Sequence, residues 1–153
     1  MVTNELFSEA EVELLTSERV ARIATTNPID NQPHVVPVCF AFDGKTIITT
    51  LNSKSKRLKH IEQGSKTAIL VDKYEENQAQ TEWKTLQGLL IQGNTRILTF
   101  QDNKQEFMNC WKLLIQKYPQ YKQWANTDYT PKDPDKRRLM KIVPTRTTRW
   151  GFE

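Results

Sequence analysis

The stretch His34–Leu51, HVVPVCFAFDGKTIITTL, predicts a β-hairpin and sets the fold class. Its first half, His34–Phe42, is apolar at successive positions, which is typical of a strand that is covered on both faces. Asp43-Gly44 follows, and this dipeptide is a strong hairpin signal because Gly readily adopts the positive φ that a tight turn needs. The β-branched residues after the turn predict the return strand.

Further strands are expected on both sides of this hairpin. Arg19–Thr26 alternates in polarity and precedes a turn rich in Pro, Asn and Asp. Lys66–Tyr74 predicts another strand, and Thr85–Phe100 predicts one long strand or two. Arg138–Phe152 predicts a final strand that is broken at Pro144. The sequence thus contains about six strand patterns, mostly with short connections that suit antiparallel pairing.

Two or three helices complete the pattern. Ser8 is followed three residues later by Glu11, which is a capping box that opens a short amphipathic helix. Apolar residues at spacings of three and four from Phe107 onward predict one long helix, with Asp102 as its N-cap and Pro119 beyond its end. Strands still dominate, so the residues favour an antiparallel barrel with helices packed outside it.

Composition limits the class of protein. The chain has 153 residues, of which 37% are hydrophobic and 26% charged, and this predicts a single globular domain over residues 1–153. The net charge of +4 permits an anionic ligand without indicating nucleic acid. No apolar run approaches the roughly 20 residues of a membrane helix, and the N-terminus lacks a signal-peptide pattern. We therefore expect a soluble, cytoplasmic protein with no membrane partner.

The cysteines and histidines do not form a metal-binding pattern. Cys39 and Cys110 lie in apolar contexts and are expected to be buried free thiols. His34 and His60 are the only histidines, and no paired Cys/His spacing is present. We expect no metal site.

The basic segment after the hairpin is the strongest functional signal. Ser53–Ile61, SKSKRLKHI, gathers cations and hydroxyls where a strand gives way to a helix. Arg57 offers a bidentate fork for phosphate, Lys56 adds charge, and free helix N–H groups suit an anion. This predicts a phosphate-binding segment. The alternative is a solvated basic helix face with Leu58 and Ile61 as its buried stripe.

Pro33–Val71, PHVVPVCFAFDGKTIITTLNSKSKRLKHIEQGSKTAILV, resembles the core of the pyridoxamine 5′-phosphate oxidase-like split-barrel family, which binds flavin. KIVPTRTTRW, at Lys141–Trp150, resembles that family's last strand. The overall pattern is most similar to the branch that uses the deazaflavin coenzyme F-420. The resemblance spans Phe7–Trp150. It implies a mainly β (α+β) fold, namely a six-stranded antiparallel split β-barrel with flanking helices, and a homodimer with its sites at the interface.

The resemblance also implies cofactor-binding residues. Thr49 and Thr50 match strand-end positions that contact the ring and the phosphate. Ser55, Lys56 and Arg57 match the family's Ser-Arg-Lys phosphate motif, with Lys and Arg exchanged.

Two other regions carry matches to the cofactor site. His34, Val36, Pro37 and Val38 match the strand whose backbone faces the flavin ring in the family. Trp150 matches a Trp that reaches the cofactor from the partner subunit. Taken alone, His34 is equally well explained as a core or rim histidine, and Trp150 as a plug of the barrel.

Some positions depart from the oxidase proper. His34 stands in place of an arginine, Cys39 in place of a lysine and Gly88 in place of a glutamine, for which Gln87 is a possible replacement. The Arg and His residues that follow the Trp in the oxidase are not found after Trp150, so we expect no true pyridoxamine phosphate oxidase.

The expected function is hydride transfer between bound coenzyme F-420 and a small unsaturated or quinone-like substrate, because the cofactor carries the chemistry. No side chain is assigned a catalytic role. The alternatives are an FMN-dependent reductase of the same fold and a non-enzymatic flavin- or haem-binding protein, with His34 and His60 as the available axial ligands. Nucleic acid is not an expected partner, because no aromatic residue lies between Lys54 and Lys66.

Overall fold

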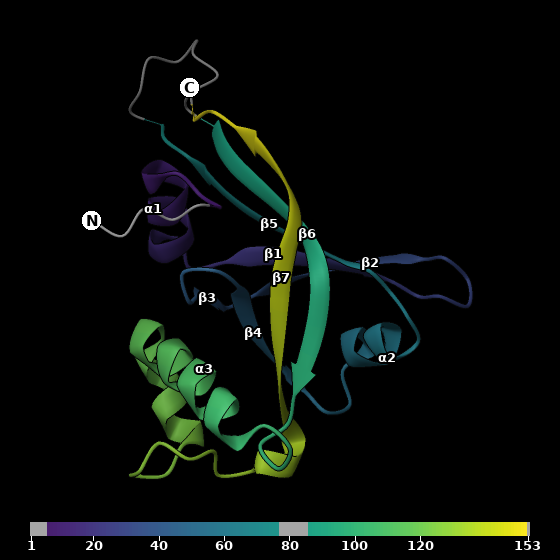
Figure 1. The fold of residues 1–153 in the computed structure, drawn as a ribbon, viewed down its shortest axis with the longest axis vertical. Helices are drawn as coiled ribbons and strands as arrows, with labels where there is room; N and C mark the ends of the chain where they lie inside the picture. Colours follow the sequence, from purple (N-terminus) through teal and green to yellow (C-terminus); the bar gives the residue numbers. More distant parts are fainter. Residues whose placement is uncertain (1–5, 77–85, 153) are drawn as a thin grey trace.

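The computed structural model describes residues 6–76 and 86–152, and its centre is an antiparallel sheet of seven strands (Figure 1). The sheet order is β2-β1-β5-β6-β7-β4-β3. Its strands are β1 (Ala21–Thr26), β2 (Pro33–Val38), β3 (Phe40–Phe42), β4 (Ile47–Asn52), β5 (Thr67–Tyr74), β6 (Leu86–Leu98) and β7 (Arg137–Trp150). The helices are α1 (Glu9–Ser17), α2 (Lys56–Glu62) and α3 (Lys104–Lys117), with short 3₁₀ helices η2 (Pro119–Trp124) and η3 (Pro134–Lys136).

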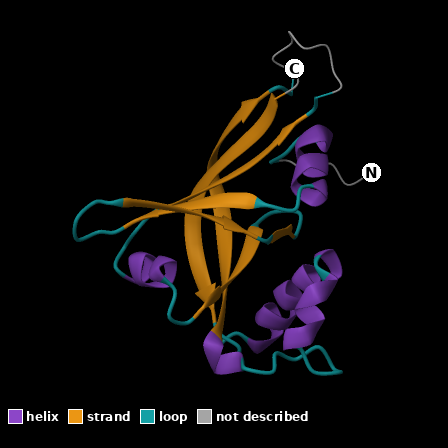
Figure 2. Ribbon diagram, turned by 180° about the vertical axis from the view of Figure 1, so that it is seen from behind, coloured by secondary structure: helices purple, strands orange, loops and turns teal. Residues whose placement is uncertain are grey.

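The predicted fold class, a mainly antiparallel β structure with flanking helices, is confirmed. Figure 2 shows the helices packed around the outside of the curved sheet. The sheet has seven strands and is not closed, because its two edge strands, β2 and β3, do not pair with each other in the described residues. No described helix has the length and apolar character needed to span a membrane.

The seventh strand arises because the chain breaks at Cys39. His34–Phe42 was expected to be one strand, and this is wrong: β2 pairs with β1, whereas β3 pairs with β4 at the other edge of the sheet. The prediction that both faces of this segment are covered is also wrong for the single chain, since Val35 is 61% exposed. The Asp43-Gly44 turn does join β3 to β4, with Gly44 at a φ of 98°.

Two buried clusters hold the helices on the sheet. One cluster joins α1 and α2 to residues of all seven strands, with Leu14, Leu15 and Leu58 as the helical contributions. The other packs α3 and η2 against β3, β4, β6 and β7, and it includes Phe107 and Trp111, both fully buried. The long helix therefore presents its periodic apolar face to the core, as its spacing predicted.

The helix caps were predicted with mixed success. The α1 capping box is confirmed: the Ser8 N–H donates to Glu11 Oε2 (2.8 Å), and the Glu11 N–H donates to Ser8 Oγ (3.3 Å). Glu11 also pairs with Arg149 of β7, which ties α1 to the sheet. The N-cap of α3 is Asn103, so the prediction of Asp102 is wrong. The reason is a preceding turn in which Thr99 Oγ1 accepts from the Asp102 N–H (3.0 Å).

The pairing of β6 with β7 is the longest contact between strands. β6 is a single strand, and β7 continues through Pro144, so the predicted break there is wrong. The pairing instead shifts register between Gln92 and Gly93, and Gly93 faces Pro144. A β-bulge of this kind accommodates proline without ending the strand. A Cβ on Gly93 would lie 2.1 Å from the Val143 carbonyl oxygen, so only glycine fits there.

The close approach at Gly93 leads to a stability prediction. Gly93→Ala should lower the free energy of unfolding by about 2–3 kcal/mol, because the added methyl group meets backbone that cannot move aside. Gly88→Ala, in the same strand, is the matched control: its Cβ would meet side-chain atoms and no backbone, with the Trp150 ring nearest at 3.0 Å, and the loss should stay below about 1 kcal/mol. Urea unfolding of both variants measures the difference. Equal losses would contradict this account of the bulge.

Candidate functional site

Helix α2 lies in the chain between β4 and β5, which belong to opposite sides of the β6–β7 pair in the sheet. The turn before it is set by Asn52, whose Oδ1 accepts from the Lys54 N–H (2.9 Å) and whose carbonyl accepts from the Ser55 N–H (2.9 Å). Ser55 is the N-cap, but its hydroxyl makes no capping hydrogen bond. Leu58 is buried in the core, so the helix is anchored there and its cations are held at the sheet.

Arg57 is the unusual residue of this helix. Its side chain is only 9% exposed, and its Nη2 donates one long hydrogen bond, of 3.5 Å, to the Thr50 carbonyl. None of the described carboxylates forms an ion pair with it. Burial lowers the pKa of Arg57, because an environment with little water disfavours its charged form. A buried cation with so little compensation favours an anionic ligand.

A pocket of about 470 Å³ lies between α2 and the β1–β2 hairpin. We call it the α2 pocket; it is lined by Asn27, Ile29, Asp30, Gln32, Pro33, His34, Lys56, Lys59, His60 and Gln63. It brings together two of the predicted site residues, His34 and Lys56. Lys59 was not predicted as a site residue, and His60 was considered only as a haem ligand. The sequence did contain a signal for both residues. Lys59 and His60 follow Lys56 by three and four positions, a spacing that places them on the same helix face.

The two histidines meet at the α2 pocket. Their rings pack edge to face, with centroids 5.4 Å apart. His60 is buried, and its Nδ1 shares a hydrogen bond of 2.9 Å with Thr25 Oγ1. His34 Nδ1 is buried without a described hydrogen-bond partner. A polar ligand atom in the pocket would satisfy it.

The electrostatics of the α2 pocket are positive. Partial burial lowers the pKa of His34, and His60, Lys56 and Arg57 lower it further. These effects favour the neutral form of His34, and an anion bound beside Lys56 and Arg57 would offset their effect on its imidazole.

Thr49 and Thr50 cannot act together through their side chains. Neighbouring residues of a strand face opposite sides of the sheet, and Thr49 is completely buried whereas Thr50 is partly exposed. Thr49 Oγ1 has no described hydrogen-bond partner, and Thr50 Oγ1 donates to the Arg138 carbonyl (3.4 Å). Of the two, Thr50 lies beside Arg57, through its backbone carbonyl.

The predicted residues of β2 are also divided between two faces. His34, Val36 and Val38 alternate with Val35 and Pro37, which are more exposed. Only His34, Val36 and Val38 therefore face the interior of the molecule, toward the α2 pocket or the core. β2 is an edge strand, so the outer side of its backbone has no strand partner in the described structure.

Trp150 lies far from α2 within one chain. Figures 1 and 2 place the C-terminal end of β7 and helix α2 in different regions of the molecule. Trp150 is 47% exposed and packs on Gly88, where a Cβ would lie 3.0 Å from its ring. Gln87, the possible replacement for a ring contact, donates through Nε2 to the Gly151 carbonyl (3.2 Å).

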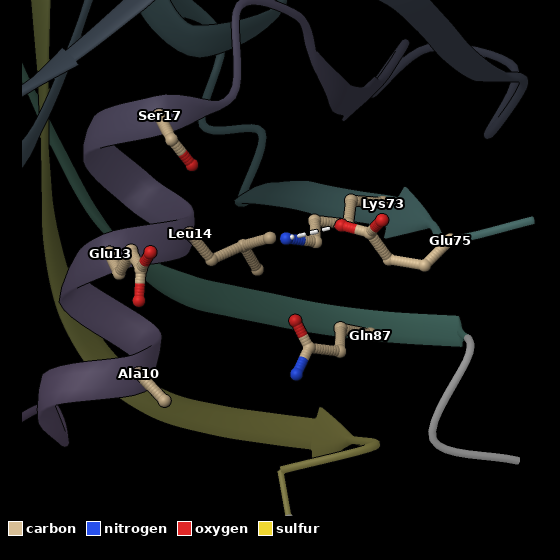
Figure 3. Close-up of a pocket in the computed structure, with 7 residues that line it drawn as sticks. All are labelled: Ala10, Glu13, Leu14, Ser17, Lys73, Glu75 and Gln87. Atoms are coloured by element: carbon tan, nitrogen blue, oxygen red, sulfur yellow. Dashed lines mark ion pairs between the residues drawn. The ribbon is translucent and has the colours of Figure 1, made fainter. Parts of the chain in front are cut away.

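A second, smaller pocket of about 170 Å³ lies between α1 and strands β5 and β6 (Figure 3). Figure 3 shows Lys73 paired with Glu75, at 2.7 Å, and Glu13 extending from the helix. The hydrogen bond to Glu75 raises the pKa of Lys73, and the charge of this lysine is balanced by the Glu75 carboxylate. The pocket contains Gln87, the possible replacement for a ring contact, but none of the residues predicted to bind phosphate, and its one lysine is already paired.

Solved structures share the fold of this chain at low sequence identity. A conserved hypothetical protein from Mycobacterium tuberculosis is 23% identical, with a TM-score of 0.69 over 95% of this chain and 85% of that one. An FAD-binding protein from Mesorhizobium loti is 18% identical, with a TM-score of 0.67 over 94% of both chains. An F420 reductase is 20% identical, with a TM-score of 0.65 over 93% of this chain and 98% of that one.

No curated protein matches the sequence. The sequence model of one family does, and it extends over residues 7–151, which include every strand and helix described above. That model is described as pyridoxamine 5′-phosphate oxidase. Its extent agrees with the resemblance noted from the sequence, and the chain therefore belongs to the pyridoxamine 5′-phosphate oxidase family.

Proposed function

We propose that the protein is an oxidoreductase that holds the phosphate of coenzyme F-420 at Arg57 and Lys56, with FMN as the alternative cofactor. Membership of the family supports a flavin-related role, as an oxidoreductase or as a binding protein. The observation that carries the proposal is Arg57, which is nearly buried and has no described carboxylate partner. The F420 reductase and the FAD-binding protein of the same fold support a ligand of this class.

The residues around α2 fit a phosphate. The Arg57 guanidinium presents a planar set of donors that matches phosphate oxygens, and Lys56 adds a second charge. His34 contributes a buried ring nitrogen that has no described partner. Ser55 has a hydroxyl that capping does not use. His34 and Lys56 line the α2 pocket, whereas Ser55 and Arg57 adjoin Lys56 in the chain and are not among the lining residues.

The ring of the cofactor would lie along β2. The edge position of this strand leaves backbone N–H and C=O groups free to bind ring atoms, which requires no particular side chain at Val36, Pro37 or Val38. When bound, such a cofactor supplies the hydride chemistry itself. The chain's part is to bind and orient it beside a small unsaturated or quinone-like substrate.

We also propose a homodimer in which the second copy completes the site. Val35 on β2 is 61% exposed, Tyr74 on β5 is 64% exposed and Trp150 on β7 is 47% exposed. Large apolar side chains in contact with water favour burial against a partner. Trp150 does not approach α2 in its own chain, so its proposed contact with the cofactor requires the partner's site.

The phosphate assignment predicts a specific loss of binding. Arg57→Gln and Lys56→Ala should each weaken the binding of F-420 by about 10- to 100-fold, since a hydrogen bond to a charged group is worth about 1.5–3 kcal/mol. Lys112→Ala, on the exposed side of α3, is the control and should leave binding unchanged. Fluorescence quenching of the cofactor gives the dissociation constants. If both site variants bind as the wild type does, the phosphate is held elsewhere.

His34 provides a test that needs no turnover. Its pKa lies below its usual range because of burial and the nearby His60, Lys56 and Arg57. Inorganic phosphate bound beside these cations should raise the pKa of His34. Phosphate affinity should therefore fall as the pH rises from the pKa of His34 in the free protein to its pKa in the complex. NMR titration of the imidazole with and without phosphate measures the shift, and Lys56→Ala should reduce it. An unchanged His34 pKa at saturating phosphate would place the anion away from the α2 pocket.

The oligomeric prediction concerns the exposed apolar residues. Sedimentation equilibrium of the wild type should give twice the mass of the chain. Val35→Lys should shift the protein toward monomer, because it places a charge in the expected interface, whereas Lys45→Ala in the exposed β3–β4 turn should not. A wild-type monomer at high protein concentration would exclude the role of Trp150 across an interface.

A further inference from the structure

Arg137, the first residue of β7, stacks on Trp124 of η2, with its Cζ 4.6 Å from the centroid of the indole ring. Tyr121 supports the stack from within the core, since its ring centroid lies 5.1 Å from that of Trp124. Trp124 is 36% exposed and Arg137 is partly exposed, so the stack lies at the surface. A guanidinium held flat on an aromatic ring keeps its N–H edge available and loses little freedom when it binds a ligand.

The charge of Arg137 is not balanced by a nearby acid. No described carboxylate forms an ion pair with it. Other arginines of the sheet do form such pairs, namely Arg22, Arg96 and Arg149. Arg138, the next residue, donates instead to the backbone carbonyls of Asp135 and Arg137. Arg137 is therefore a fixed cation that an anionic ligand would compensate.

The stack adjoins the part of β4 that contacts Arg57. Arg137 lies opposite Asn52 in the pairing of β4 with β7. Arg57 donates to the carbonyl of Thr50, two residues before Asn52 on the same strand. Positions two residues apart on a strand are separated by about 7 Å. The two arginines are therefore held at neighbouring positions along β4, one from α2 and one from β7.

Tyr121 lies close enough to both arginines to act on them electrostatically. Burial lowers the pKa of Arg57, and Tyr121 acts in the opposite direction. Burial and then Cys39 raise the pKa of the Tyr121 phenol, whereas Arg137 lowers it. Tyr121 is itself buried and stays uncharged at neutral pH, so it does not neutralise either guanidinium. Two cations around one neutral phenol favour a ligand with more than one negative charge.

We propose that Arg137 binds a second anionic group of the ligand whose phosphate lies at Arg57. This inference rests on the function proposed above. FMN ends at its phosphate, whereas the phosphate of F-420 is a diester that continues into carboxylates and that of FAD continues into a second phosphate. The planar guanidinium can bind either group through two parallel N–H···O bonds. Arg137 thus favours a cofactor that extends beyond its first phosphate.

Orthophosphate and pyrophosphate are the first probes, and calorimetric titration of the ligand-free protein gives their affinities. Pyrophosphate should bind the wild type at least about 10-fold more tightly than orthophosphate, because it can reach both arginines. Arg137→Gln should remove most of this advantage and leave the orthophosphate affinity within about twofold, which also shows that the variant is folded. Lys136→Gln removes a neighbouring exposed charge and should keep the advantage. No advantage in the wild type, or one that persists in Arg137→Gln, overturns the proposal.

Arg57→Gln separates this proposal from the phosphate site itself. The variant should weaken the binding of both anions, because both occupy the first position. If it leaves orthophosphate binding unchanged, the phosphate position proposed at α2 is wrong and the second position falls with it. If Arg57→Gln weakens both anions and Arg137→Gln weakens neither, the phosphate site stands and only the role of Arg137 is overturned.

The cofactors then identify the second anionic group. Arg137→Lys keeps the charge but lacks the planar fork, and fluorescence quenching measures its binding of F-420, FAD and FMN. The variant should bind F-420 at least about fivefold more weakly than the wild type and FMN within about twofold. A loss for FAD in place of F-420 would assign the position to a second phosphate. Equal losses for all three cofactors, or no loss for any of them, would overturn the proposal.

Discussion

The antiparallel pairing of β6 with β7 is the interaction on which the rest of the structure depends. The two strands are the longest in the sheet, and each carries a further set of strands, with β5, β1 and β2 on one side and β4 and β3 on the other. Their register is set at one bulge, where Gly93 approaches the Val143 carbonyl too closely for any side chain. A slip there would turn the buried face of β7 outward and displace both sides of the sheet.

The candidate site follows from this arrangement, because α2 connects the two sides. The helix leaves β4 on one side and leads to β5 on the other, and Leu58 anchors it in the core between them. Arg57 is consequently buried against Thr50 of β4, whereas Lys56 and His60 face the hairpin of β1 and β2. A ligand bound by Arg57 and also by Lys56 and His60 would contact both sides of the sheet. The whole fold therefore positions these side chains, and not the helix alone.

Local sequence signals predicted local structure well. The capping box at Ser8 and the Asp43-Gly44 turn depend on a few neighbouring residues, and both form as expected. The break at Cys39 could not be predicted, because it depends on which distant strands β2 and β3 pair with. Periodicity also implies that Thr49 and Thr50 face opposite sides, a constraint that a residue-by-residue resemblance does not contain. His60 was considered from the sequence only as a haem ligand. Its place in the α2 pocket could not be predicted, because it depends on packing against His34 from another segment.

The most direct test of the central claim is equilibrium binding of F-420 and of FMN to the ligand-free wild-type protein, measured side by side by fluorescence quenching, with inorganic phosphate as a competitor. The account predicts that F-420 binds more tightly than FMN and that phosphate weakens its binding, because both ligands compete for Arg57 and Lys56. Tighter binding of FMN would contradict the choice of deazaflavin. Binding of neither cofactor, or binding that is insensitive to phosphate, would contradict the phosphate site itself.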